Sequence, residues 1–257
     1  MKKVKKMVVL VLVMTGVFAF GCCAWAGLLD KDVLVVGTES TYPPYESRDP
    51  AGNLVGFDID LMQIIADKLG KTLDWQDMAF DALIPALVTK RIDVVIAGLS
   101  ITPERAERVL FSKPYEISVS AFIVQAGSPI KDLAALNGKT VAVQIGTVQE
   151  TYSHTIPGVT VLTFQRFTDC THEVALGRVD AALMDVPVVR EFIGQQEFAG
   201  KIDIGFKQVL TEGGKALAYH LDEKEFAAAV DKILDELEAG GQIDELRKKW
   251  NMEQEDD

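Results

Sequence analysis

The sequence predicts an α/β protein whose sheets are largely parallel. Between Val33 and Ile96, compact apolar runs typical of buried strands alternate with segments of helical periodicity. The connections are short, and strands joined through helices in this way pair in parallel. The same alternation starts again near residue 119 and ends near residue 208, which predicts a second unit of the same kind.

The first unit contains three predicted strands, at residues 33–38, 72–75 and 92–96. A helix follows Gly56, with Asp58 as its predicted cap and Gly70 as its stop. A second helix starts near Phe80, with Asp81 as its predicted cap. The polar residues between the first strand and the first helix, 48–55, predict a hairpin.

The stretch that ends at Arg105 carries the strongest local signal. Thr102 is a good helix cap, and Pro103 suits the first helical position, where no N–H is needed. Arg105 then lies at the positive end of the helix dipole, which is unfavourable for a cation. A bound anion would relieve this, held by the guanidinium and by donors near Gly98 and Ser100. The alternative is a solvated arginine at an ordinary strand-to-helix corner.

An aromatic loop follows the first strand. Its sequence, Glu-Ser-Thr-Tyr-Pro-Pro-Tyr from Glu39, contains two prolines that fix the backbone and hold Tyr42 and Tyr45 in place. Open α/β sheets bind ligands beyond the carboxyl ends of their strands. We therefore expect Tyr42 to contact a ligand and Tyr45 to anchor the core. Phe80 would project from the start of its helix toward the same region.

The second unit repeats this design. Strands are predicted at 117–125, 140–143, 159–162 and 179–184, and helices at 131–136, 168–177 and 186–195. Residues 144–150 again form a glycine-containing turn before a helix start, and Asp185 lies at the carboxyl end of a strand. A short strand (216–219) and two helices (222–239 and 243–250) complete the chain before an acidic tail.

The amino terminus has the pattern of a secretory signal peptide over residues 1–26. Four lysines precede an uncharged run, and Ala-Trp-Ala at its end fits a cleavage site. An uncleaved membrane anchor, or a lipoprotein with acylated Cys22, are the alternatives. Cleavage would change the net charge from −12 to about −16, which argues against nucleic acid or anionic lipid as a partner. Cys170 would then be the one remaining thiol, and we expect it to be buried.

Neither a catalytic centre, nor a metal site, nor a cofactor is expected. The three histidines lack the spacing of metal ligands, and the sequence contains no recognisable nucleophile constellation or phosphate-binding glycine loop.

Several motifs, in order, resemble the polar-amino-acid periplasmic binding proteins, the solute-binding components of ABC importers. They cover residues 33 to 250 and are Gly-Thr-Glu-x-x-Tyr-Pro-Pro-Tyr, Gly-Phe-Asp-Ile-Asp-Leu, Phe-Asp-Ala-Leu-Ile-Pro, Ser-Ile-Thr-Pro-Glu-Arg and Gly-Thr-Val-Gln-Glu. The resemblance implies the type II periplasmic-binding-protein fold: two lobes, each a mostly parallel sheet flanked by helices, joined by two hinge strands. Lobe 1 would comprise residues 28–117 and 213–257, and lobe 2 residues 118–212.

The resemblance also implies a periplasmic monomer that binds a free amino acid in the cleft and delivers it to a membrane-embedded ABC permease. Arg105 resembles the arginine that clamps the α-carboxylate, assisted by Ser100 and the backbone near Gly98. Thr147 and Val148 would reach the same carboxylate from the other lobe. Some members of the family have serines where this chain has Ala97 and Gly98, and many relatives have a threonine where it has Val148.

Four more residues resemble those that contact the α-ammonium and the side chain of the ligand. Asp185 resembles the acid that receives the α-ammonium, and Tyr42 and Phe80 resemble the pair that sandwiches the side chain. Glu39 lies where some members keep an acid for a cationic side chain. These residues favour arginine, lysine or ornithine, with glutamine or another polar amino acid as the alternative.

Two further function classes are compatible with the sequence. Periplasmic cyclohexadienyl dehydratases share this fold, and they need a general acid over a ring substrate. A sensor domain presented to a membrane partner is the other.

The segment Gly-Gly-Lys-Ala-Leu from residue 213 departs from the usual hinge sequence of the family.

Overall fold

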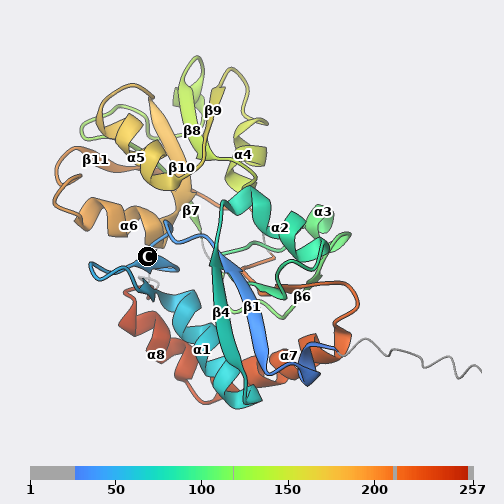
Figure 1. The fold of residues 1–257 in the computed structure, drawn as a ribbon. Coiled ribbons are helices and arrows are strands. Elements are labelled where there is room, and N and C mark those ends of the chain that lie inside the picture. Colours follow the sequence, from blue (N-terminus) through green and yellow to red (C-terminus); the bar gives the residue numbers. More distant parts are fainter. Residues whose placement is uncertain (1–26, 118, 211–212, 254–257) are drawn as a thin grey trace, which may run out of the picture.

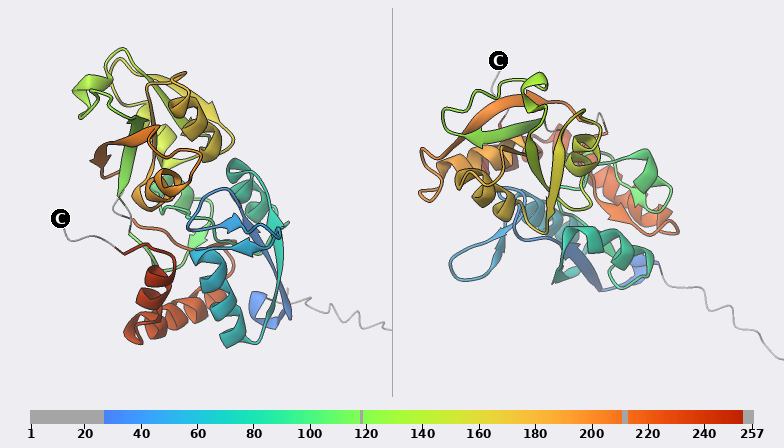
Figure 2. Two further views of the ribbon diagram at one scale, coloured as in Figure 1. Left: turned by 90° about the vertical axis from the view of Figure 1, so that its left-hand side faces the viewer. Right: turned by 90° about the horizontal axis from the view of Figure 1, so that it is seen from above.

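The computed structural model describes residues 27–117, 119–210 and 213–253. They form two α/β lobes, which lie one above the other in Figure 1 and in the left-hand view of Figure 2. Each lobe is built on one five-stranded sheet. The predicted signal peptide, including Cys22, and the last four residues of the tail lie outside the described residues.

The sheet of the first lobe has the strand order β4-β1-β5-β12-β6. Its strands are β1 (Val33–Thr38), β4 (Thr72–Asp77), β5 (Val94–Val95), β6 (Leu110–Phe111) and β12 (Ala218–Tyr219). Its helices are α1 (Phe57–Leu69), α2 (Phe80–Val88), α3 (Pro103–Ala106), α7 (Lys224–Ala239) and α8 (Gln242–Lys249). A hairpin of β2 (Ser47–Arg48) and β3 (Leu54–Val55) and a 3-10 turn at Leu28–Asp30 complete it. Helices α7 and α8 lie beside α1 at the base of the lobe (Figure 1).

The sheet of the second lobe has the order β11-β7-β10-β8-β9. Its strands are β7 (Ser120–Gln125), β8 (Thr140–Gln144), β9 (Thr160–Phe164), β10 (Ala181–Asp185) and β11 (Ile202–Gln208). Its helices are α4 (Val148–Ser153), α5 (Phe167–Ala175) and α6 (Val186–Gly194), with a 3-10 turn at Ala134–Leu136 where a short helix was predicted.

The predicted two-lobed α/β architecture is confirmed, and both sheets are mixed. Strand β1 pairs in parallel with β4 and β5, and β8 pairs in parallel with β9 and β10. Strands β7 and β12, which follow the two passages of the chain between the sheets, pair antiparallel with their neighbours. A strand that arrives from the other lobe enters the sheet without a crossover helix, so it need not run parallel.

The two passages between the lobes lie beside each other. The first joins β6 to β7 and the second joins β11 to β12. They pair antiparallel at Glu116 and Lys215, and Lys215 also pairs with Ser100. The backbone N–H of Lys215 donates to the carbonyl of Glu116 (2.7 Å) and its carbonyl accepts from Tyr115 (2.9 Å). The unusual hinge segment is therefore tied to the other passage by its backbone.

Two predicted helix caps are wrong. Helix α1 begins after Gly56, and the carboxylate of Asp58 instead accepts hydrogen bonds from the N–H of Gly98 (2.7 Å) and the hydroxyl of Tyr115 (2.8 Å). Helix α2 begins after Ala79, and Asp81 lies in its first turn. A long-range partner outcompetes the local capping role of Asp58. By contrast, the left-handed Gly70 that ends α1 is confirmed.

The core is apolar and contains Tyr45 and Cys170, both fully buried as predicted. Within the residues that the structure describes, no helix combines the length and apolar character needed to cross a bilayer. The same residues include no cluster of three or more His, Cys, Asp or Glu side chains that could hold a metal ion.

Candidate ligand site

A cavity between the two lobes brings all nine predicted site residues together. It is lined by Glu39, Tyr42, Phe80, Gly98, Ser100, Arg105, Thr147, Val148 and Asp185. Six residues that the sequence analysis did not single out complete the lining: Glu46, Ala97, Gln144, Gln149, Phe167 and Lys215. Both lobes contribute, so closing or opening the lobes makes or breaks this site.

Arg105 is placed by the predicted helix start. The hydroxyl of Thr102 accepts a hydrogen bond from the backbone N–H of Arg105 (3.2 Å) and caps α3, as expected. The guanidinium donates to the carbonyl of Ser100 (2.7 Å) and, across the cleft, to the carbonyl of Gly146 (2.9 Å). It also lies over the ring of Phe80, 5.6 Å from the centroid.

The charge of Arg105 is unbalanced within its surroundings. Burial lowers the pKa of Arg105 to about 10, so the guanidinium still carries its charge at neutral pH. In the described part of the chain, no carboxylate forms an ion pair with it. A half-buried guanidinium with carbonyl partners only and unused donors is suited to an anionic group of a ligand.

Glu39 lies in the same cavity and is almost completely buried. Its carboxylate accepts hydrogen bonds from the hydroxyl of Thr41 (2.6 Å) and from Gln144 of the second lobe (3.3 Å). Burial raises the pKa of Glu39 above its usual value, although these hydrogen bonds oppose the shift. A ligand cation beside Glu39 would stabilise its ionised form.

Asp185 lies at the end of β10 as predicted, and it is paired within the protein. Its Oδ2 accepts hydrogen bonds from the ammonium of Lys215 (2.5 Å) and the hydroxyl of Tyr42 (2.6 Å). Its Oδ1 accepts from Ser120 (2.9 Å) and Gln149 (3.1 Å). Burial alone would raise the pKa of Asp185, but the charge of Lys215 and these hydrogen bonds hold it below its usual value. Asp185 is therefore an ionised carboxylate at neutral pH.

Two acidic residues, Glu46 and Asp58, are buried near Lys215. Burial raises the pKa of Asp58 to about 6, and burial together with the charge of Asp58 raises the pKa of Glu46 well above its usual value. The charge of Lys215 partly offsets both shifts. The two carboxyls therefore titrate as a pair, at a higher pH than isolated carboxyls would.

The remaining predicted residues are close to Arg105, but several of their polar groups are already used. Thr147 caps α4, accepting from the N–H of Glu150 (3.2 Å) and donating to the carbonyl of Gln144 (2.7 Å). The N–H of Gly98 donates to Asp58. The hydroxyl of Thr147 and the N–H of Gly98 thus serve the protein, whereas the guanidinium of Arg105 has donors beyond the two that bind carbonyls.

Lys215 is the most important residue that the sequence analysis missed. The sequence comparison marks it only as part of an unusual hinge segment. A single lysine within the apolar stretch Gly-Lys-Ala-Leu-Ala is the signal that could have pointed to a buried charge. Phe167, whose ring centroid is 4.8 Å from that of Tyr42, was missed because it comes from the other lobe.

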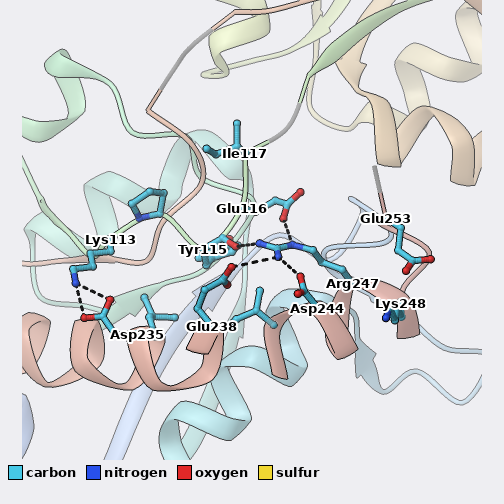
Figure 3. Close-up of a pocket in the computed structure, with 13 residues that line it drawn as sticks. Lys113, Tyr115, Glu116, Ile117, Asp235, Glu238, Asp244, Arg247, Lys248 and Glu253 are labelled. Atoms are coloured by element: carbon cyan, nitrogen blue, oxygen red, sulfur yellow. Dashed lines mark hydrogen bonds and ion pairs between the residues drawn. The ribbon is translucent and has the colours of Figure 1, made fainter. Parts of the chain in front are cut away.

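A second hollow lies outside the cleft, between the passage at residues 113–117 and helices α7 and α8 (Figure 3). Its central cation, Arg247, donates to Glu116 (2.9 Å), Asp244 (2.7 Å) and the carbonyl of Tyr115 (3.0 Å). Arg247 is therefore paired with carboxylates, unlike Arg105 in the cleft. Its bonds to Tyr115 and Glu116 tie the passage at residues 113–117 to helix α8.

Comparison with known proteins identifies the family. Residues 34–253 match the bacterial extracellular solute-binding proteins, family 3. The arginine-binding extracellular protein ArtP of Bacillus subtilis is 34% identical over 224 residues, which cover 86% of each chain. The lysine/arginine/ornithine-binding periplasmic protein of Escherichia coli is 36% identical over 225 residues, covering 84% of this chain and 86% of that one.

Solved structures are similar throughout the fold. An ancestral arginine-binding protein bound to arginine superimposes with a TM-score of 0.81 at 37% identity, covering 86% of this chain and 98% of that one. The structure of an ancestral arginine-binding protein bound to glutamine gives a TM-score of 0.79 at 37% identity, with 87% and 99% covered.

Proposed function

The chain belongs to the bacterial extracellular solute-binding proteins, family 3, and on that premise we propose that it binds a free polar amino acid for an ABC importer. A cationic side chain, as in arginine, lysine or ornithine, is favoured. One observation carries the proposal: the unbalanced guanidinium of Arg105 and the buried carboxylate of Glu39 line the same interlobe cavity. The names of the relatives point to the same ligands.

The proposed pose follows from the charges. Arg105 holds the α-carboxylate, with Ser100 and the backbone at Thr147 and Val148 beside it. Glu39 faces the cationic side chain. A charge removed from water must find a partner of opposite sign, and these two residues supply one partner for each end of the ligand.

The aromatic residues would enclose the side chain of the ligand, and its α-amino group would lie toward Asp185. Tyr42 and Phe80 line the cavity, and each already has a cation near its ring: Lys215 at 5.8 Å and Arg105 at 5.6 Å, respectively. A cationic ligand would gain further attraction to such rings.

We propose the lobe boundaries expected from the sequence, residues 28–117 with 213–257 and residues 118–212. Interlobe hydrogen bonds from Tyr42 to Asp185, from Gln144 to Glu39 and from Arg105 to Gly146 support a cleft that closes by hinge motion. A ligand that touches both lobes favours the closed form through its differential affinity. The closed form is the one that we propose docks on a permease, as a monomer.

Thermal-shift screening against the twenty amino acids and ornithine, followed by calorimetry, tests the proposal. We expect stabilisation by arginine, lysine or ornithine with dissociation constants in the micromolar range or below. Stabilisation by glutamine alone would overturn the cationic choice. No stabilisation by any amino acid would overturn amino-acid binding itself.

We propose binding without turnover. A dehydratase of this fold needs a protonated general acid, and Asp185 does not meet this need because its pKa is held low by Lys215 and its other donors. Incubation with prephenate or arogenate should give no phenylpyruvate or phenylalanine. Formation of either product would favour the enzyme.

For location, we propose export to the periplasm by residues 1–26. Amino-terminal sequencing of the mature protein should start at Gly27. A lipid-modified start at Cys22 would instead make the protein membrane-anchored.

A further inference from the structure

The ammonium of Lys215 occupies the place expected for a ligand's ammonium. Its side chain is buried, with a relative exposure of 3%. Nζ donates to Asp185 (2.5 Å) and to the carbonyl of Gly98 (3.0 Å), and it lies 4.9 Å from the centroid of the Tyr45 ring. Because its backbone is bonded to the other passage between the lobes, the lysine is held in this position from both ends.

Asp185 has little capacity left for a ligand. An ionised carboxylate offers about four lone-pair sites. In this structure they face four protein donors, on Tyr42, Ser120, Gln149 and Lys215. The charge of the carboxylate is also neutralised by Lys215. An incoming α-ammonium would have to displace that lysine or lie beside it as a like charge.

We infer that Lys215 is a specificity-determining residue. Its ammonium pairs with Asp185, which would otherwise pair with the ammonium of the ligand. If the proposed function holds, on which this role rests, Arg105 selects the carboxylate of the ligand and Glu39 selects its distal cation. The α-amino group then contributes little to affinity. The site then takes ω-guanidino and ω-amino carboxylic acids as well as the corresponding amino acids.

Calorimetry with L-arginine and 5-guanidinopentanoate, which is arginine without its α-amino group, tests this. The wild-type protein should prefer arginine by less than tenfold. In Lys215→Met, Asp185 is freed for the ligand, and the preference for arginine should rise by about 10–100-fold, the value of one charge-assisted hydrogen bond. A wild-type preference of tenfold or more, or an unchanged ratio in Lys215→Met, overturns the inference.

Two control variants separate specificity from folding. Lys113→Met removes an exposed lysine that pairs with Asp235 outside the cleft and should leave the wild-type ratio unchanged. In Lys215→Met/Asp185→Asn, the freed charge is removed as well, and the preference for arginine should disappear again. If Lys215→Met does not fold, the wild-type ratio decides alone.

The outcomes also distinguish this inference from the proposed function. Strong arginine binding with a tenfold or larger preference overturns the role of Lys215 and leaves the proposed function intact. Binding of 5-guanidinopentanoate without arginine supports that role and overturns amino-acid binding. If neither ligand binds, the pairs lysine/6-aminohexanoate and ornithine/5-aminopentanoate are tested in the same way, and no binding by any pair overturns both.

Discussion

Replacing Arg105 with alanine should abolish tight ligand binding. A guanidinium has five N–H donors. In this structure Arg105 donates to two carbonyls, those of Ser100 and Gly146. The remaining donors can bind a carboxylate in a bidentate manner. Two charge-assisted hydrogen bonds contribute about 3–6 kcal/mol, so the dissociation constant should rise by about 10²–10⁴-fold.

Isothermal titration calorimetry measures this change. Arg105→Lys keeps the charge but loses the planar fork, and we expect an intermediate loss of affinity. Arg91→Ala is the matched control, because Arg91 is exposed in the same lobe and lies outside the residues that line the cleft. Circular dichroism would verify folding of each variant. An affinity of Arg105→Ala within threefold of the wild type would refute the carboxylate assignment.

Three other predictions concern the charges and the buried thiol. Burial raises the pKa of Glu39, so lowering the pH protonates this carboxylate in the free protein. The affinity for arginine, measured by calorimetry, should therefore fall from pH 8 to pH 5. In Glu39→Gln, the affinity should change less with pH. Burial raises the pKa of Cys170, so a thiol reagent at pH 8 should label the mature protein only after denaturation, and rapid native labelling would contradict this. Arg247→Ala leaves the buried carboxylate of Glu116 without its ion-pair partner and should lower the unfolding free energy by about 3 kcal/mol in urea titrations, whereas exposed Lys248→Ala should not.

The parts of the site that depend on local rules could be predicted from the sequence. Thr102 caps α3 and Pro103 occupies its first turn, because the hydroxyl accepts a hydrogen bond from a free N–H and the first helical position needs no N–H of its own. That cap fixes where Arg105 emerges. Gly70 ends α1 in a left-handed conformation for an equally local reason. These features need only a few consecutive residues.

The features that were missed or misplaced depend on distant partners. Asp58 looks like a cap, yet its carboxylate binds the N–H of Gly98, 40 residues away. Lys215 reaches the carbonyl of Gly98 over 117 residues of chain, through the second passage between the lobes. Hydrophobic periodicity carries no information about such pairings, because it reports only which side of an element is buried.

The two sides of the cleft therefore differ in what they require from a ligand. At Asp185, the closing ion pair is made by Lys215, and it joins the lobes without any contribution from outside the protein. At Arg105, the carbonyl of Gly146 is the only interlobe hydrogen-bond partner among the described residues, and no carboxylate there pairs with its charge. A ligand can shift the opening equilibrium only through contacts that differ between the two forms. Closure should therefore depend mainly on two parts of the ligand, the carboxylate held by Arg105 and the distal group beside Glu39. Glu39 itself is bonded across the cleft to Gln144 of the second lobe.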